Sequence, residues 1–154
     1  AVLLAALPLD FRFIANHVFA AYPVIGPAIR GASHHIVDRG SWRGRAECGR
    51  AMVEALGGGR SLLVFPEGTT AAGGRLLPFR SGAFRAAAKS GTVVVPLAIR
   101  GTRALMPDGG ALLSPVPVEV EVLAPLVPWG ADREAVATLR DRAAAAIQDA
   151  LDRR

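Results

Sequence analysis

The stretch SLLVFPEGTT, residues 61–70, carries the most information about the fold of this 154-residue chain. Residues 61–65 are largely apolar and predict a short buried strand, because such strands favour branched and aromatic side chains. Pro66 ends the strand, since proline is tolerated only where the ladder of hydrogen bonds stops. Glu67 then presents a carboxylate, followed by a glycine and two threonines. In α/β proteins ligands bind in loops after the carboxyl ends of strands, so residues 67–70 are predicted to form a polar binding site.

The overall composition predicts a single domain that covers residues 1–154. Hydrophobic residues make up 51% of the chain, which is enough for a genuine core. The net charge is +5, and every basic residue except Lys89 is an arginine. Arginine makes bidentate contacts with phosphate and carboxylate, which suggests a nucleic acid, a phospholipid or a phosphorylated metabolite as partner; genomic composition explains the same bias equally well. Nucleic acid is the least favoured partner, because the arginines are not grouped with aromatic residues.

Several kinds of site are disfavoured by the residues present. Cys48 is the single cysteine, so the chain has no internal disulfide and no thiolate metal site. His34, His35 and Asp38 could be imagined as metal ligands, but adjacent strand residues point to opposite faces, and we expect no metal. The sequence contains neither the G-x-S-x-G motif of hydrolases nor a phosphate-binding P-loop. It also has no apolar run of about 18 residues that could span a bilayer.

Apolar periodicity predicts strands that alternate with helices, and therefore an α/β fold with a mixed, largely parallel sheet and helices on its faces. Pro96 lies inside the fourth predicted strand and indicates an edge, a bulge or an early end there. The helix after residue 41 should bury one face, formed by Trp42, Ala46, Gly49, Met52, Val53 and Leu56. The predicted strands are 11–15, 35–37, 61–65, 93–99 and 118–122; the predicted helices are 1–7 (the tail of a helix), 23–30, 42–56 with Ser41 as N-cap, 82–89, and a final helix capped by Asp132.

Four segments of the chain resemble the sequence blocks of the glycerolipid acyltransferases, the family that includes the 1-acylglycerol-3-phosphate (lysophosphatidic acid) acyltransferases. FPEGT at residues 65–69 resembles the third block of that family and is its most specific part. Residues 31–39 resemble the second block, residues 77–84 the basic segment after the third, and residues 94–99 the fourth. The segments occur in the family's order and cover nearly the whole chain, and the resemblance implies an α/β fold of the glycerolipid acyltransferase type.

The family's first block, Asn-His-x4-Asp, supplies a catalytic base that these 154 residues do not contain. Asn16 and His17 are followed by Tyr22 where the block requires an aspartate, and His17 lies too close to Arg39. In the family's register they end the strand after the first block. We therefore expect the His–Asp block upstream of Ala1, an N-terminally incomplete chain, and no catalytic residue within it. A degenerate catalytic role for His17 is the alternative.

The resemblance also implies which residues hold the acceptor. Arg39, at the end of the second block, would bind the acceptor's phosphate, and Arg80 would supply a second guanidinium. The alternatives are a solvated turn residue for Arg39 and a solvated surface charge for Arg80.

The other implied binding residues lie in the third block. Glu67 would orient the acceptor's hydroxyl groups or fix a nearby arginine; alternatively it caps the following segment. Gly68 would let the backbone approach the ligand closely. Thr69 and Thr70 would donate or accept hydrogen bonds there.

The function implied is transfer of a fatty acyl group from acyl-CoA or acyl-carrier protein to a lysophospholipid or glycerol-phosphate acceptor, in phospholipid synthesis. The acyl donor is a co-substrate, and we expect no cofactor. We expect the protein at the cytoplasmic face of the membrane, either peripheral or anchored by a region before Ala1, with no nucleic-acid partner. The alternative is a non-catalytic module on the same scaffold that binds a membrane or an anionic ligand.

Overall fold

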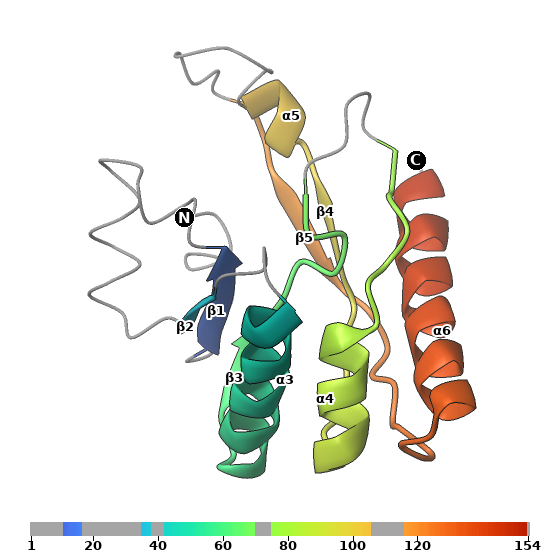
Figure 1. Cartoon of the computed structure of the whole chain (residues 1–154). Helices are drawn as coiled ribbons and strands as arrows, with labels where there is room; N and C mark the ends of the chain where they lie inside the picture. The colour runs from blue at the N-terminus through green and yellow to red at the C-terminus, as the bar shows by residue number, and fades with distance from the viewer. Residues whose placement is uncertain (1–10, 17–34, 38–41, 70–74, 106–115, 154) are drawn as a thin grey trace.

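A computed structural model of the protein describes residues 11–16, 35–37, 42–69, 75–105 and 116–153 (Figure 1). Predictions for residues 1–7, residues 23–30, His17, Asp38 and Ser41 lie outside these residues. The elements, in chain order, are β1 (Phe11–Asn16), β2 (His35–Val37), α3 (Trp42–Gly57), β3 (Ser61–Leu63), α4 (Gly82–Ser90), β4 (Leu97–Arg100), α5 (Thr102–Leu105), β5 (Glu119–Val122) and α6 (Arg133–Asp152).

The strands of the described residues form two sheets. The first has the order β2-β1-β3 and is parallel throughout, with Phe11 opposite Ser61 and Ile14 opposite His35. The second is an antiparallel pair, in which Leu97 of β4 lies opposite Val122 of β5. The α/β class predicted from the alternating pattern is confirmed. Among the described residues the parallel and antiparallel pairings lie in two separate sheets and not in the one mixed sheet that the sequence predicted.

The three long helices lie side by side, with α4 between α3 and α6 (Figure 1). Alanine-rich α4 packs into two apolar clusters. Ala86 contacts Cys48 and Met52 of α3, whereas Phe84 and Ala88 belong to a second cluster with α6. Small side chains allow close helix packing and favour helix formation, so α4 forms the centre of the described core.

The final helix follows its sequence signals closely. The Asp132 side chain accepts a hydrogen bond from the Ala135 N–H at 2.9 Å, so the predicted N-cap is confirmed. Val136, Leu139 and Ala143 lie on one face of this helix and are buried. On α3 the predicted apolar face is right for Met52, which is buried, and wrong for Ala46, which is exposed.

Two predicted strands are shorter than expected. β3 ends at Leu63, and Phe65 is 52% exposed. Its ladder with β1 stops at the pair Phe13–Leu63, and the chain turns away toward Pro66. The strand predicted over residues 93–99 is also shorter, and Val93 and Val95 are 44% and 47% exposed. The interruption that Pro96 indicated is present. Regular pairing begins only after Pro96, because proline has no N–H to donate to a ladder.

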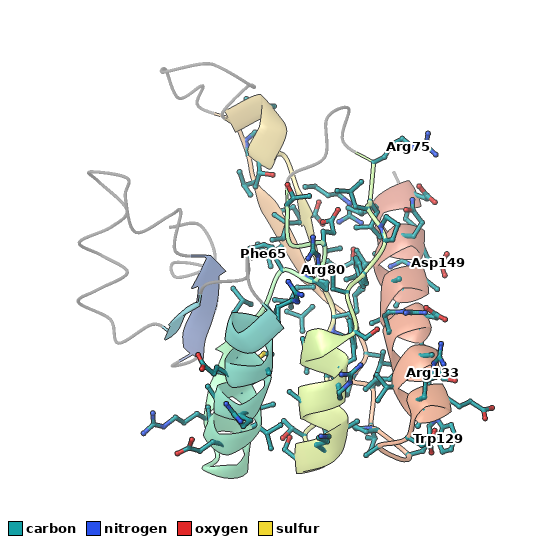
Figure 2. The ribbon with its side chains drawn as sticks, in the orientation of Figure 1. Phe65, Arg75, Arg80, Trp129, Arg133 and Asp149 are labelled. Atoms are coloured by element: carbon teal, nitrogen blue, oxygen red, sulfur yellow. The ribbon has the colours of Figure 1, made fainter. Side chains whose placement is uncertain are left out.

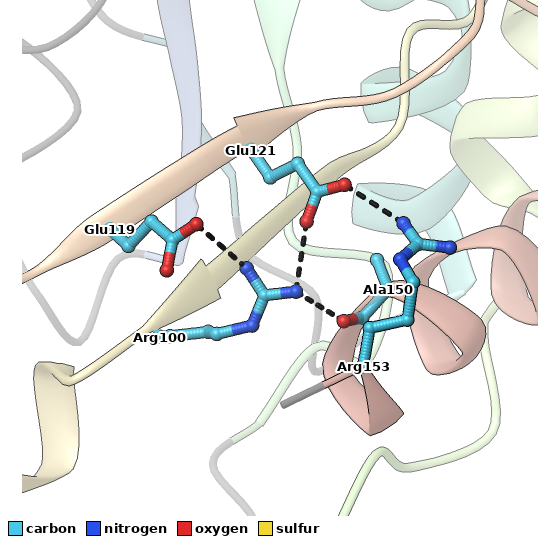
Figure 3. Close-up of polar contacts among 5 residues, drawn as sticks. All are labelled: Arg100, Glu119, Glu121, Ala150 and Arg153. Atoms are coloured by element: carbon cyan, nitrogen blue, oxygen red, sulfur yellow. Dashed lines mark hydrogen bonds and ion pairs between the residues drawn. The ribbon is translucent and has the colours of Figure 1, made fainter.

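A polar network joins the C-terminal end of α6 to the β4–β5 pair (Figure 3). Arg100 donates to Glu121 Oε2 at 2.8 Å and to the carbonyl oxygen of Ala150, and it forms an ion pair with Glu119 at 3.2 Å. Arg153 donates to Glu121 Oε1 at 2.8 Å. The hydrogen bonds from Arg100 and then Arg153 hold the pKa of Glu121 below its ordinary value. The network therefore fixes α6 against the second sheet.

None of the helices in the described residues is both long enough and apolar enough to cross a membrane.

Candidate functional site

The candidate site is the turn that follows β3, at the carboxyl edge of the parallel sheet. Pro66 and Glu67 form the turn, and the Gly68 N–H donates to the carbonyl oxygen of Phe65 at 3.2 Å. Gly68 has φ +72°, a left-handed conformation that costs a residue with a side chain about 1–2 kcal/mol. The sequence requires glycine here because the backbone must reverse directly behind the carboxylate.

The carboxylate of Glu67 joins this turn to a later segment of the chain. Its Oε2 accepts a hydrogen bond from the Leu77 N–H at 2.7 Å, in a partly buried position. The sequence suggested that Glu67 orients the acceptor, fixes an arginine or caps the following segment. A hydrogen bond to the Leu77 N–H is most similar to the last of these roles. The partner lies ten residues further on, and no local pattern in the sequence identified it.

Arg80 lies over the same turn. Its main-chain N–H donates to the carbonyl oxygen of Pro66 at 2.9 Å, and its side-chain Nε donates to the main-chain oxygen of Glu67 at 3.4 Å. Figure 2 shows Arg80 and Phe65 near one another at the upper ends of α3 and α4. Arg80 is exposed, and no carboxylate of the described residues forms an ion pair with it. Its outer nitrogens are therefore able to bind an anion.

Gly68 allows this arrangement for a second reason. A Cβ atom on Gly68 would lie 2.8 Å from Arg80 Nε and 3.2 Å from its Cδ, too close for the arginine to keep its position. The sequence predicted that Gly68 permits close approach of a ligand. In the structure the group that lies close to Gly68 is the Arg80 side chain. Any side chain at residue 68 would displace it.

The remaining predicted residues are placed only in part. Thr69 is described and exposed, whereas Arg39 and Thr70 lie outside the described residues. β2 and β3 are both parallel to β1, so Val37 and Leu63 end their strands at the same edge of the sheet. Within the described part of the chain, no three carboxylate, histidine or cysteine side chains gather as a group that could hold a metal ion.

Comparison with known proteins identifies the class of this chain. The family model described as Acyltransferase matches residues 1–100. The chain belongs to the acyltransferase family, and the resemblance seen in its sequence blocks is confirmed.

Curated relatives and a solved structure agree with that assignment. The chain is 38% identical over 106 residues to the chloroplastic 1-acyl-sn-glycerol-3-phosphate acyltransferase BAT2 of Brassica napus, a match that covers 69% of this chain and 31% of the relative. The Neisseria gonorrhoeae 1-acyl-sn-glycerol-3-phosphate acyltransferase is 34% identical over 88 residues, covering 57% of this chain and 34% of its own. The crystal structure of the acyltransferase PlsC from Thermotoga maritima superposes with a TM-score of 0.68 at 24% identity, covering 94% of this chain and 58% of PlsC. This last likeness confirms the predicted fold.

The chain thus spans about a third of the length of the curated relatives that it matches, 31% for BAT2 and 34% for the Neisseria protein.

Proposed function

We propose that this chain provides the acceptor-binding part of an O-acyltransferase that acts on 1-acylglycerol-3-phosphate or a related lysophospholipid. The observation that carries the proposal is Arg80, held over the Pro66–Glu67 turn with no carboxylate partner in the described residues. A guanidinium group binds a phosphate through paired hydrogen bonds. Arg39 is proposed as the second phosphate ligand, and Glu67, Gly68, Thr69 and Thr70 as the residues that line the acceptor.

The proposed reaction is acyl transfer from a thioester. The acceptor's hydroxyl oxygen attacks the thioester carbonyl carbon, the C–S bond breaks, and the hydroxyl proton passes through a histidine base to the leaving thiolate. An aspartate beside that histidine would fix its tautomer. In the His-x4-Asp pattern the aspartate lies five positions after the histidine. After His17, His34 and His35 these positions hold Tyr22, Arg39 and Gly40. The base is therefore proposed to come from a His–Asp block outside residues 1–154.

Substitution of Arg80 in the full-length protein tests the proposed phosphate site. Loss of a charged hydrogen bond costs about 1.5–3 kcal/mol, so Arg80→Ala should raise the acceptor KM about 10- to 150-fold. The donor KM should not change, and Arg80→Lys should restore part of the loss. Arg75→Ala is the matched control, because Arg75 is an exposed arginine on the same segment. An acceptor KM that Arg80→Ala leaves unchanged removes Arg80 from the site, and the same experiment on Arg39→Ala tests that residue.

The donor and the location are further parts of the proposal. Acyl-CoA and acyl-carrier protein are both proposed as donors, and steady-state rates with matched acyl chains distinguish them. The protein is proposed to act at the cytoplasmic face of a membrane. Sedimentation with lysophosphatidic acid vesicles tests the membrane contact. The alternative function is a non-catalytic binding module, which the lack of a His–Asp block in residues 1–154 favours. Vesicle binding by the full-length protein without acyl transfer would support that alternative.

A further inference from the structure

A groove lies between α4 and α6, lined by residues of the first turn of α4 and of the first two turns of α6. We call it the α4–α6 groove; it is a cavity of about 630 Å³. Three arginines line it, Arg85 from α4 and Arg133 and Arg140 from α6, together with Ser81 and Asp132. Figure 1 shows the two helices side by side, and Figure 2 shows Arg133 near the start of α6. Nothing in the acceptor site proposed above uses these arginines.

The charges of the α4–α6 groove are unbalanced. One carboxylate, Asp132, lines the groove, and its Oδ1 already accepts the Ala135 N–H at 2.9 Å. Arg140 is partly neutralised, since its Nε lies 2.8 Å from Asp141 Oδ1. Arg85 and Arg133 are exposed, and among the described residues no carboxylate forms an ion pair with either.

The start of α4 reinforces this positive charge. The α4 helix has no side-chain cap at Ser81, whose hydroxyl is instead 3.4 Å from Arg140 Nη1. The α6 helix begins at Arg133, seven residues or about 10 Å before Arg140 along its axis. One end of the groove therefore meets the N-terminus of α4 and the other meets that of α6. Helix N-termini carry partial positive charge and favour anions, so the uncapped start of α4 adds to the charge of the arginines. At the start of α6 the carboxylates of Asp132 and Glu134 offset this effect.

We propose that the α4–α6 groove binds the phosphoryl group of a phosphate-bearing ligand, held by Arg85 and Arg133. Its volume falls in the range of small-molecule sites, roughly 300–1,000 Å³. A planar guanidinium matches the oxygens of a phosphoryl group bidentately. The phosphoryl group could belong to a soluble phosphorylated molecule or to a lipid headgroup. The experiment therefore includes one probe for each source.

The test measures binding of inorganic pyrophosphate to the full-length protein by calorimetry at 0.15 M salt, where long-range attraction is screened. We expect saturable binding that Arg85→Glu and Arg133→Glu each weaken at least tenfold. Arg142→Glu is the matched control, because Arg142 is exposed on the same helix and does not line the groove. It makes the same change of net charge and should alter affinity less than twofold. Circular dichroism melts verify that the variants fold.

The second probe is a vesicle that contains phosphatidic acid, compared with pure phosphatidylcholine vesicles in a sedimentation assay. Binding of either probe that depends on Arg85 and Arg133 but not on Arg142 supports the groove, and the probe that binds identifies the source. Equal loss in the Arg142→Glu control, or no binding of either probe, overturns the proposal. Both measurements are made without acyl transfer, so a failure of the proposed function would leave their outcome unchanged.

Discussion

Replacement of Gly68 by alanine tests the geometry of the candidate site most directly. Gly68 has φ +72°, and a Cβ there would lie 2.8 Å from Arg80 Nε. The substitution therefore has two consequences: it strains the backbone of the turn, and it displaces the Arg80 side chain from above it. A second glycine separates these effects, because Gly59 has φ +76° and a Cβ on it would meet no atom within 4 Å.

The magnitudes follow from these contacts. A left-handed alanine costs about 1–2 kcal/mol, and the smaller conformational freedom of alanine in the unfolded chain returns about 0.4–1 kcal/mol. Gly59→Ala should therefore lower the free energy of unfolding by about 1 kcal/mol. Gly68→Ala should lower it by only slightly more, since the bond from Arg80 Nε to the Glu67 carbonyl oxygen is exposed and 3.4 Å long. An arginine side chain can move aside at small cost.

The two variants should differ in function much more than in stability. If Arg80 binds the acceptor's phosphate, its displacement in Gly68→Ala should raise the acceptor KM about tenfold or more, whereas Gly59→Ala should leave the KM unchanged. Urea denaturation gives the stabilities, and acyl-transfer kinetics of the full-length variants give the KM values. Equal acceptor KM values in the two variants would refute the reasoning, because the contact between Gly68 and Arg80 would then have no bearing on binding.

Three further substitutions test other contacts. Glu67→Ala removes the acceptor of the Leu77 N–H at 2.7 Å and should lower the free energy of unfolding in urea by about 1–3 kcal/mol, whereas Glu67→Gln keeps an acceptor oxygen and should lose less. The hydrogen bond from Arg100 lowers the pKa of Glu121, so the carboxylate stabilises the fold above its unfolded pKa. This contribution disappears as pH falls through the folded pKa, so the urea midpoints of wild type and Glu121→Gln should converge only below the unfolded pKa of about 4.3. Phe84→Ala deletes a ring that is 4% exposed in the core and should cost about 3–5 kcal/mol by calorimetry.

Each of these predictions has an outcome that contradicts it. A Glu67→Ala protein as stable as wild type would mean that the bond to Leu77 contributes nothing to stability. A Glu121→Gln midpoint that stays below the wild-type value by a constant amount at every pH would show that the carboxylate is not linked to folding. Trp129→Ala is the control for Phe84→Ala, because the Trp129 side chain is 61% exposed and its loss should change stability by less than about 0.5 kcal/mol.

The elements that the sequence predicted well are those specified by neighbouring residues. The cap of α6 is an example, since Asp132 and Ala135 are three residues apart and the capping bond is local. The errors concern burial, which depends on what packs from elsewhere. The apolar run around Val95 resembles a buried strand, yet its regular partner begins only opposite Leu97, and Val93 and Val95 remain exposed. Periodicity records hydrophobicity and does not show where a pairing strand ends.

The same distinction explains how far the candidate site could be predicted. The FPEGT motif identified Glu67 and Gly68, but the partners of both residues lie on the segment that enters α4. That segment is fixed by the core: Phe79, next to Arg80, stacks on Phe84 with ring centroids 6.2 Å apart. The position of Arg80 therefore depends on helix packing as much as on the motif. A sequence motif can name the turn, but the arginine above it belongs to a segment whose neighbouring Phe79 packs on the cluster shared by α4 and α6.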